Sequence, residues 1–185
     1  SIKLNEKAII KELKTSNILI TGAAGSIGAG LVFQIARFAK GKLILLDQAE
    51  SGLYELETEL KNRFANIDYE IVIGSIRNKE RLAKTFEAFK PQMVFHAAAY
   101  KHVPLMEENP TEAIRTNVMG TKNLVDVSIE YEVEKFVLIS TDKAVNPTNV
   151  MGASKRIAEI YAQTANGNGK TRFVTTRFGN VLGSN

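Results

Sequence analysis

The stretch that decides the fold is Thr21-Gly22-Ala23-Ala24-Gly25-Ser26-Ile27-Gly28, which follows an apolar run and opens a helical pattern. Gly22 permits a tight turn, Gly25 lets the backbone approach a pyrophosphate, and Gly28 lets helix and strand pack closely. The free N–H groups and the positive end of the helix dipole then face the phosphates. Glycines can also serve loop packing alone, but the strand–turn–helix context predicts a dinucleotide site.

On both sides of this turn, short β-type runs alternate with amphipathic helical patterns. The alternation predicts an α/β fold, a Rossmann-like doubly wound parallel sheet with helices on both faces. The predicted strands are 17–21, 42–47, 69–74, 93–96, 135–140 and 171–176, and the predicted helices are 26–39, 51–64, 78–88, 111–131 and 149–165. Residues 1–14 are predicted as an N-terminal helical extension and residues 15–185 as one NAD(P)-binding Rossmann domain.

The composition fits one soluble domain, because 185 residues with 44% hydrophobic and 24% charged side chains can form an ordinary core. Cysteine is absent and histidine occurs twice, so we expect neither disulfides nor a metal site. No run reaches the ~18 apolar residues of a membrane span. The net charge of +4 suits an anionic ligand or simply a mildly basic surface, and we expect no nucleic-acid partner.

Asp47 at the end of the second predicted strand is placed to bind the adenosine ribose diol, unless it is an ordinary turn residue. No Lys or Arg directly follows it, so a 2′-phosphate would meet carboxylate repulsion. This favours NAD as the cofactor, although Arg77 and Lys42 leave NADP open. Ser75 follows the third strand, where it could hydrogen-bond the adenine, and the small residues Ala97-Ala98-Ala99 would let the cofactor lie close.

A second informative stretch is Ser140-Thr141-Asp142-Lys143, where a hydroxyl, a carboxylate and an ammonium group follow one another after an apolar run. Lys155 comes next on a predicted helix, one turn after Met151 and on the same face. A hydroxyl followed by x-x-x-Lys is typical of a short-chain dehydrogenase active site, except that tyrosine usually stands where Met151 is. A surface turn and a core methionine are the simpler interpretation of the same residues.

Five segments together resemble a known family: TGAAGSIG, HAAAYKHVPLMEENP, TNVMGTKN, STDKAVNPTNVMGASKR and RFGNVLGSN. They resemble the extended short-chain dehydrogenase/reductase superfamily, and within it the UDP-N-acetylglucosamine 4,6-dehydratases of the membrane-anchored polysaccharide-biosynthesis (capsular polysaccharide) subfamily. Members of that subfamily carry Met in the tyrosine place, so the resemblance makes Met151 a mark of the subgroup. It implies a UDP-sugar substrate, a role in capsule or O-antigen polysaccharide biosynthesis, and a substrate-binding C-terminal portion missing here.

The resemblance also implies a cellular setting. We expect a cytoplasmic domain whose full-length protein is anchored at the cytoplasmic face of the inner membrane through a region absent from this sequence. A homo-oligomer stays open, because the relevant helices show no decisive apolar excess.

The family reaction assigns roles to the catalytic residues. Thr141 would hydrogen-bond the C4 hydroxyl, Asp142 would be the acid for departure of the C6 hydroxyl, and Lys143 the base at C5. Asp142 must then be protonated, so we expect its pKa to be raised. Lys155 would hold the nicotinamide ribose, and Met151 can pack but cannot transfer a proton. The acceptor of the C4-hydroxyl proton stays open among Lys155, Lys143, Asp142 and a water relayed through Thr141.

Asn117 could bend the long helix through a side-chain bond or simply make a packing contact, and Glu107 and Glu108 are expected to be plain exposed acids. The predicted cofactor-binding residues are Gly22, Ala24, Gly25, Ser26, Ile27, Gly28, Asp47, Ser51, Ser75, Ile76, Ala97, Ala98, Ala99, Asn117 and Lys155. The predicted substrate residues are Lys101, after the fourth strand, and Asn180, by resemblance only.

Two other functions stay open beside the dehydratase. A nucleotide-sugar epimerase would use the same cofactor and a 4-keto intermediate, but it needs no acid to expel water, so the Asp142–Lys143 pair favours the dehydratase. An NAD(P)-binding module without catalysis is the alternative from another class. A chain that lacks the substrate portion can also bind cofactor without turning over.

Overall fold

A computed structural model of the chain describes residues 6–13 and 16–179, with the side chains of residues 6–9 left out. Six strands form one sheet in the order β3-β2-β1-β4-β5-β6, and every neighbouring pair is parallel. The strands are β1 (Ile18–Thr21), β2 (Leu43–Asp47), β3 (Tyr69–Ile73), β4 (Met93–His96), β5 (Lys135–Thr141) and β6 (Arg172–Phe178). The predicted doubly wound parallel sheet is confirmed, and the strand order reverses between β1 and β4, where such folds bind ligands.

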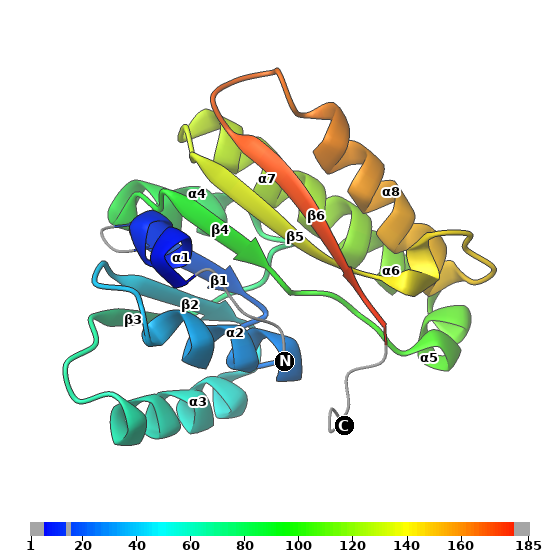
Figure 1. The fold of residues 1–185 in the computed structure, drawn as a ribbon. Helices are drawn as coiled ribbons and strands as arrows, with labels where there is room; N and C mark the ends of the chain where they lie inside the picture. Colours follow the sequence, from blue (N-terminus) through cyan, green and yellow to red (C-terminus); the bar gives the residue numbers. More distant parts are fainter. Residues whose placement is uncertain (1–5, 14–15, 180–185) are drawn as a thin grey trace.

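Helices cover both faces of the sheet (Figure 1). Helices α2 and α3 lie on one face, and α4, α7 and α8 lie on the other. The helical segments are α1 (Glu6–Leu13), α2 (Ser26–Ala36), α3 (Glu50–Arg63), α4 (Lys79–Phe89), α5 (Val103–Glu108), α6 (Pro110–Ala113), η1 (Ile114–Gly120), α7 (Thr121–Glu130), η2 (Asp142–Ala144) and α8 (Val150–Thr164). None of the helices within the described ranges combines the length and the apolar character that crossing a membrane would need.

The core consists of one hydrophobic layer on each face of the sheet. Leu19 packs into the layer under α4 and α7, whereas its neighbours Ile18 and Ile20 pack into the layer under α2 and α3. All three side chains are fully buried. A parallel strand buried on both faces reads as a continuous apolar run, which explains why the strands were visible in the sequence.

The predicted helix 111–131 is not one α-helix. The chain forms the short helix α6, then the π-helical segment η1, and only then α7. Asn117 lies in the middle of η1, and its side chain bonds to the backbone of Tyr100, outside the helix. At the end of η1, a Cβ added at Gly120 would lie 2.6 Å from Ile76 Cδ1, so the glycine allows this close approach. Tertiary bonds and packing therefore reshape the helix.

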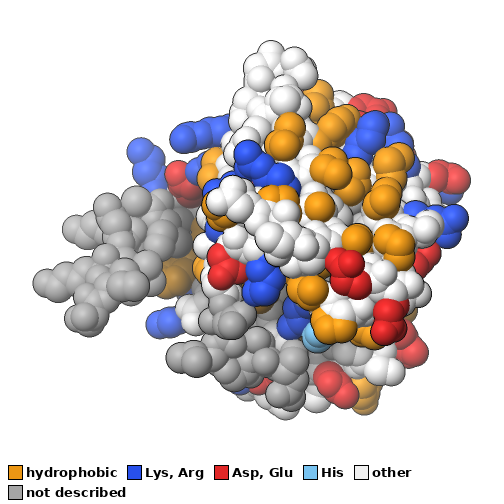
Figure 2. Space-filling view, turned by 90° about the vertical axis from the view of Figure 1, so that its right-hand side faces the viewer, with side chains coloured by type: hydrophobic (Ala, Val, Ile, Leu, Met, Phe, Trp, Pro, Cys, Tyr) orange, Lys and Arg blue, Asp and Glu red, His pale blue; other side chains and the backbone are white. Residues whose placement is uncertain are grey.

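Helix α5, which contains Pro104, is not among the predicted helices. The proline stands in the first turn of α5, where its missing N–H costs nothing. Met106 is 6% exposed and joins a small cluster with Ala113 and Met151, which holds this helix against α8. Figure 2 shows this side of the molecule, where hydrophobic side chains lie between acidic and basic ones.

His96 at the end of β4 links three elements inside the core, as a packed strand-end histidine should. Its Nδ1 lies 2.7 Å from Thr21 Oγ1 on β1, and its Nε2 lies 2.9 Å from Thr121 Oγ1 on α7. A neutral imidazole has one donor and one acceptor nitrogen, so both threonine bonds can form. Burial first, and then the charge of Lys155, lower the pKa of His96 to about 3.

This lowered pKa predicts a pH-dependent stability. The unfolded chain takes up a proton on this histidine below about pH 6.5, whereas the folded chain does not until about pH 3. The free energy of unfolding should therefore fall as the pH falls below about 6.5, with a slope approaching about 1.4 kcal/mol per pH unit. Urea denaturation of wild type and His96→Asn between pH 7.5 and about pH 5 measures this slope, since carboxylates contribute little above about pH 5.

His96→Asn should be less stable at pH 7.5 but should show a flatter dependence on pH. The control is His102→Asn, because His102 is exposed and should leave the wild-type slope unchanged. Equal slopes in wild type and His96→Asn would contradict the assignment.

Candidate active site

The glycine-rich turn between β1 and α2 has the geometry that its sequence predicts. Gly22 has a φ of +70°, and a Cβ placed there would lie 2.5 Å from the backbone nitrogen of Ala98. A Cβ at Gly28 would lie 1.9 Å from the carbonyl oxygen of Gly22. Gly25 is the N-cap of α2 and provides no side-chain bond to the first turn. The N–H groups of that turn are therefore available to an anion, as a diphosphate requires.

Asp47 lies beside this turn and retains capacity for a ligand. Its Oδ2 accepts the N–H of Ala24 at 3.0 Å, and its Oδ1 accepts the N–H of Ala49 at 3.0 Å. A carboxylate has about four acceptor sites, so two stay free for a ribose diol. The carboxylate lines a cavity of about 130 Å³, whose wall is formed by Gly22, Gly25, Leu46, Asp47, Gln48, Gly74, Ser75, Ile76, Ala97, Ala98, Ala99, Tyr100 and Thr116.

Thr116 was not predicted, and it adds to the fit of an adenosine here. Its Oγ1 is buried, and within the described residues it has no hydrogen-bond partner. A buried hydroxyl without a partner beside an open cavity is suited to a polar group of a bound molecule. The small cavity, the free acceptor sites of Asp47 and the uncapped helix turn together fit the adenosine and diphosphate portions of a dinucleotide.

A larger cleft of about 580 Å³ continues from the same turn along the strand ends. Its walls are Gly25, Ser26, Ile27, Gly28, Ala97, Ala99, Tyr100, Lys101, His102, Ile139, Ser140, Thr141, Lys143, Met151, Lys155, Phe178 and Gly179. The structure thus brings together the glycine turn, the residues after β4 and most of the predicted catalytic set. Tyr100, His102, Phe178 and Gly179 were missed, although strand ends at the carboxyl edge are where such residues are expected.

Several predicted site residues do not line either cavity. Ala24 contributes its backbone N–H to Asp47, and Ser51 lies on α3 outside both cavities. Asn117 is 1% exposed, and its amide bonds to Tyr100 and to Ser154 Oγ. It fixes the loop after β4 to α8, which makes it a positioning residue in this structure. Asn180 lies outside the described residues.

The turn with the predicted catalytic residues Thr141, Asp142 and Lys143 follows the end of β5 directly. The Thr141 hydroxyl donates to Asp142 Oδ1 at 3.0 Å, and Lys143 Nζ lies 3.4 Å from the same oxygen. Asp142 is exposed and does not line the cleft, but a Cβ at Gly179, which does line it, would lie 3.6 Å from Asp142 Oδ2. The Thr141 bond first, and then Lys143, lower the pKa of Asp142. The expected raised pKa is therefore wrong for this state, because the carboxylate is solvated and its neighbours stabilise its charge.

Lys155 differs from Lys143 in its burial. Its side chain is 5% exposed, and its Nζ donates to the carbonyl oxygen of Ile139 at 2.9 Å. Burial lowers the pKa of Lys155 to about 8, although the charge of Glu159 opposes the shift. Lys155 is thus the lysine whose pKa burial brings close to neutral pH.

Glu159, one turn further along α8, is a functional neighbour that the sequence did not reveal. Its fully buried carboxylate accepts Arg177 Nε at 2.9 Å and Nη2 at 2.7 Å, and Arg156 Nη1 at 3.1 Å. Burial alone would raise the pKa of Glu159, but the bonds from Arg177 and Arg156 outweigh it and lower the pKa to about 2. The bidentate pair ties the edge strand β6 to α8 beside Lys155.

Two further contacts hold the start of α8, one to α5 and one to the turn after β5. Glu107 was expected to be a plain exposed acid, but its Oε1 accepts the N–H of Val150 at 2.5 Å. A Cβ at Gly152 would lie 2.4 Å from the carbonyl oxygen of Lys143. Met151 between them is 2% exposed and packs in the cluster with Met106.

The Gly152 contact predicts a matched pair of substitutions. Gly152→Ala should lower the free energy of unfolding by about 1–3 kcal/mol, because the new methyl group must push the Lys143 turn away. Gly30→Ala is the control, since Gly30 is also helical but no atom lies within 4 Å of the added Cβ. It should stabilise the protein by about 0.5–1 kcal/mol. Urea denaturation compares them, and equal effects would refute the close approach.

The fold and the cleft define a Rossmann-like α/β domain with a glycine-rich turn of the dinucleotide-binding type. The chain belongs to the family of polysaccharide biosynthesis proteins, whose sequence model matches residues 18–185. The family resemblance seen in the sequence is thereby confirmed. Among the described residues, no three His, Cys, Asp or Glu side chains gather as metal ligands would.

Individual relatives agree with this family. The capsular polysaccharide biosynthesis protein CapD of Staphylococcus aureus is 52% identical, over 99% of this chain and 31% of the relative. The UDP-N-acetylglucosamine 4,6-dehydratase (inverting) of Campylobacter jejuni (strain 81-176) is 39% identical, over 91% of this chain and 50% of the relative. The crystal structure of UDP-glucose 4-epimerase from Thermotoga maritima with UDP-glucose is 26% identical with a TM-score of 0.74, over 87% of this chain and 54% of the other. The chain thus spans half or less of the length of CapD and of the Campylobacter dehydratase.

Proposed function

We propose that this chain is the cofactor-binding and catalytic part of a nucleotide-sugar 4,6-dehydratase that acts on UDP-N-acetylglucosamine. The observation that carries the proposal is the pair of Asp142 and Lys143, whose lysine lines the cleft, together with Met151 where oxidoreductases of this type have tyrosine. The similarity to the Campylobacter dehydratase supports it. The proposal extends to a membrane-anchored full-length protein and to a substrate-binding portion that follows residue 185.

NAD is the proposed cofactor, and when bound it would supply the redox chemistry by taking a hydride, one proton with two electrons, from sugar C4 and returning it at C6. The uncapped first turn of α2 would hold its diphosphate, Asp47 the adenosine ribose, and Lys155 the second ribose. Because Lys155 is held by Ile139 and has a pKa of about 8, it can both bind a hydroxyl and exchange a proton with it near neutral pH.

Elimination of water from C5 and C6 removes one proton from C5 and adds one to the departing C6 hydroxyl, and the residues of this turn can account for both. Asp142 and Lys143 form an ion pair in this structure, with Lys143 Nζ 3.4 Å from Asp142 Oδ1. Transfer of one proton from Lys143 to Asp142 would give the neutral amine that takes the C5 proton once the ketone at C4 makes it acidic. Asp142 would then give its proton to the departing C6 hydroxyl, which leaves as water. The C5 proton would thereby replace the one that Lys143 gave up, and the ion pair would be restored.

A sugar 4-epimerase is the second candidate, because the Thermotoga epimerase shares this fold at 26% identity. Epimerisation uses the same cofactor and the same C4 chemistry, but it leaves the C6 hydroxyl in place. It gives the adjacent Asp142 and Lys143 no function, which is why the dehydratase is preferred. A binding module without catalysis would also have no use for them.

Mass spectrometry of a reaction with UDP-N-acetylglucosamine separates these functions. The preparation must include the sequence that corresponds to the remaining length of the relatives. Loss of one water supports the dehydratase, an isomer of unchanged mass supports the epimerase, and an unchanged substrate supports the binding module.

Asp142→Asn and Lys143→Met should each lower the rate of water loss by about 10²–10⁴-fold, since each removes one step of the proton path. NADH binding should persist in both, because neither side chain holds the dinucleotide in this proposal. Glu108→Gln is the control on an exposed carboxylate away from the turn. Full dehydratase activity in Asp142→Asn would overturn the assigned path.

A further inference from the structure

A second, shallow hollow lies beside the cavity of about 130 Å³ that fits an adenosine, here called the adenosine cavity. Its residues bear on which dinucleotide binds. Gln48 and Ser75 line both the adenosine cavity and this hollow. The other walls of that hollow are Arg77, Asn78 and Lys79. A phosphate on the 2′ oxygen of a ribose held by Asp47 would extend toward Gln48 and so toward this hollow. The cations of the hollow therefore decide whether such a phosphate is tolerated.

A 2′-phosphate would face an unfavourable field at Asp47. The carboxylate is fixed by the N–H groups of Ala24 and Ala49, so it cannot turn away from the ribose. A phosphate monoester carries about two negative charges near neutral pH and needs a cation to approach a carboxylate. Arginine is the side chain best suited to this, because its planar guanidinium binds phosphate with two donors.

Arg77 is placed to be that cation, but a second carboxylate holds it. Its Nη1 donates to Oε2 of Glu112, a residue of α6, at 2.7 Å. The Arg77 backbone is anchored as well, since its carbonyl oxygen accepts Asn123 Nδ2 and its N–H donates to Ser75 Oγ. The guanidinium is thus paired with a carboxylate of α6 while its residue lines the hollow.

The other cations of this region differ from Arg77. Lys42 precedes β2, so it lies at the edge of the sheet opposite Asp47, and it pairs with Asp68 at 3.0 Å. Arg81 Nε donates to the carbonyl oxygen of Ile73. Lys79 lines the hollow as Arg77 does. Arg77 is therefore the cation of the hollow whose ion pair a substitution on α6 would release.

We propose that Glu112 is a specificity-determining residue of the dinucleotide site. By holding Arg77 it withholds the cation that a 2′-phosphate would require beside Asp47, and it keeps the site selective for the dinucleotide with a free ribose diol. The NAD preference then rests on two carboxylates, Asp47 on the ribose itself and Glu112 through Arg77. The inference rests on the proposed function only in requiring that a dinucleotide binds in the cleft.

The size of the effect follows from the exposure of the pair. Arg77 and Glu112 are 35% and 37% exposed, so their ion pair is of the weak, solvent-screened kind. Release of Arg77, together with loss of the Glu112 charge, should tighten the binding of a 2′-phosphate by about 3–10-fold. Removing the Asp47 charge in addition should increase the change further, because the two carboxylates act on the same phosphate.

The test is a fluorescence titration with NADH and NADPH of protein freed of copurified nucleotide. Wild type should bind NADH more tightly than NADPH. Glu112→Gln should tighten NADPH by about 3–10-fold with NADH unchanged. The double variant Glu112→Gln/Arg77→Met should return NADPH affinity to the wild-type value, because the released cation is then gone. These titrations need no turnover.

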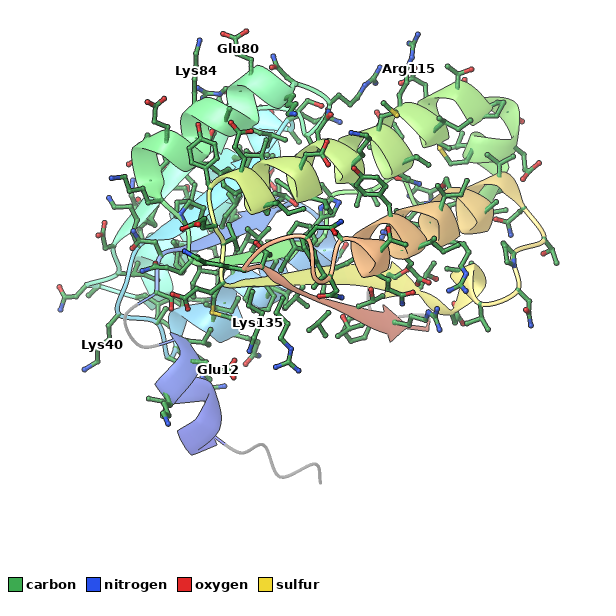
Figure 3. All side chains as sticks on the ribbon, turned by 90° about the horizontal axis from the view of Figure 1, so that it is seen from above. Glu12, Lys40, Glu80, Lys84, Arg115 and Lys135 are labelled. Carbon is green, nitrogen blue, oxygen red and sulfur yellow. The ribbon has the colours of Figure 1, made fainter. Side chains whose placement is uncertain are left out.

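Glu80→Gln is the matched control. It removes the same charge from a 2.6 Å ion pair with Lys84, and Figure 3 shows both side chains on the outer side of α4. Its NADH and NADPH affinities should equal those of wild type. Arg115, which also contacts Glu112 and points outward in Figure 3, gives a second check. Arg115→Gln should not tighten NADPH, since Arg77 stays held.

The outcomes separate this inference from the proposed function. If wild type binds neither dinucleotide, the proposed function fails as well. If NADH binds but Glu112→Gln leaves NADPH affinity unchanged, or if Glu80→Gln tightens NADPH equally, the inference about Glu112 is overturned and the proposed function stands.

Discussion

The buried ammonium group of Lys155 is the constraint on which the rest of the site depends. A lysine that is 5% exposed must have its charge supported, and the Ile139 carbonyl oxygen provides the hydrogen bond. This bond fixes α8 to the end of β5. Glu159 adds a compensating charge and binds Arg177 on the next strand, so the same helix face holds two strands. The charge of Lys155 also helps to keep His96 neutral in the core.

Because α8 is held in this way, it packs closely against the turn after β5. Gly152 brings the helix backbone to the carbonyl oxygen of Lys143, and Met151 fills the space beneath the cleft. In the proposed mechanism the chemistry would divide between a buried lysine suited to the cofactor and the C4 oxygen, and an exposed Asp142–Lys143 pair suited to C5 and C6. A methionine in the tyrosine place fits this division, since the proton chemistry of the proposed elimination would lie on the turn after β5.

The sequence predicted what local sterics and periodicity determine, and missed what distant pairs determine. The glycine turn and the six strands follow from φ requirements at Gly22 and from continuous apolar runs, so their positions were predicted closely. The π-helical segment depends on bonds from Asn117 to Tyr100, and the buried Glu159 depends on Arg177, far away in the chain. The pKa of Asp142 was misjudged because solvent exposure of a turn cannot be read from residue order.

The central claim is that the Asp142–Lys143 turn eliminates water while hydrogen moves within one sugar. The most direct measurement uses UDP-N-acetylglucosamine deuterated at C4, with a preparation that includes the sequence corresponding to the rest of the relatives, and locates the deuterium in the product by NMR. The account predicts a product that has lost one water and carries the deuterium at C6. Deuterium retained at C4 in a product of unchanged mass would contradict it.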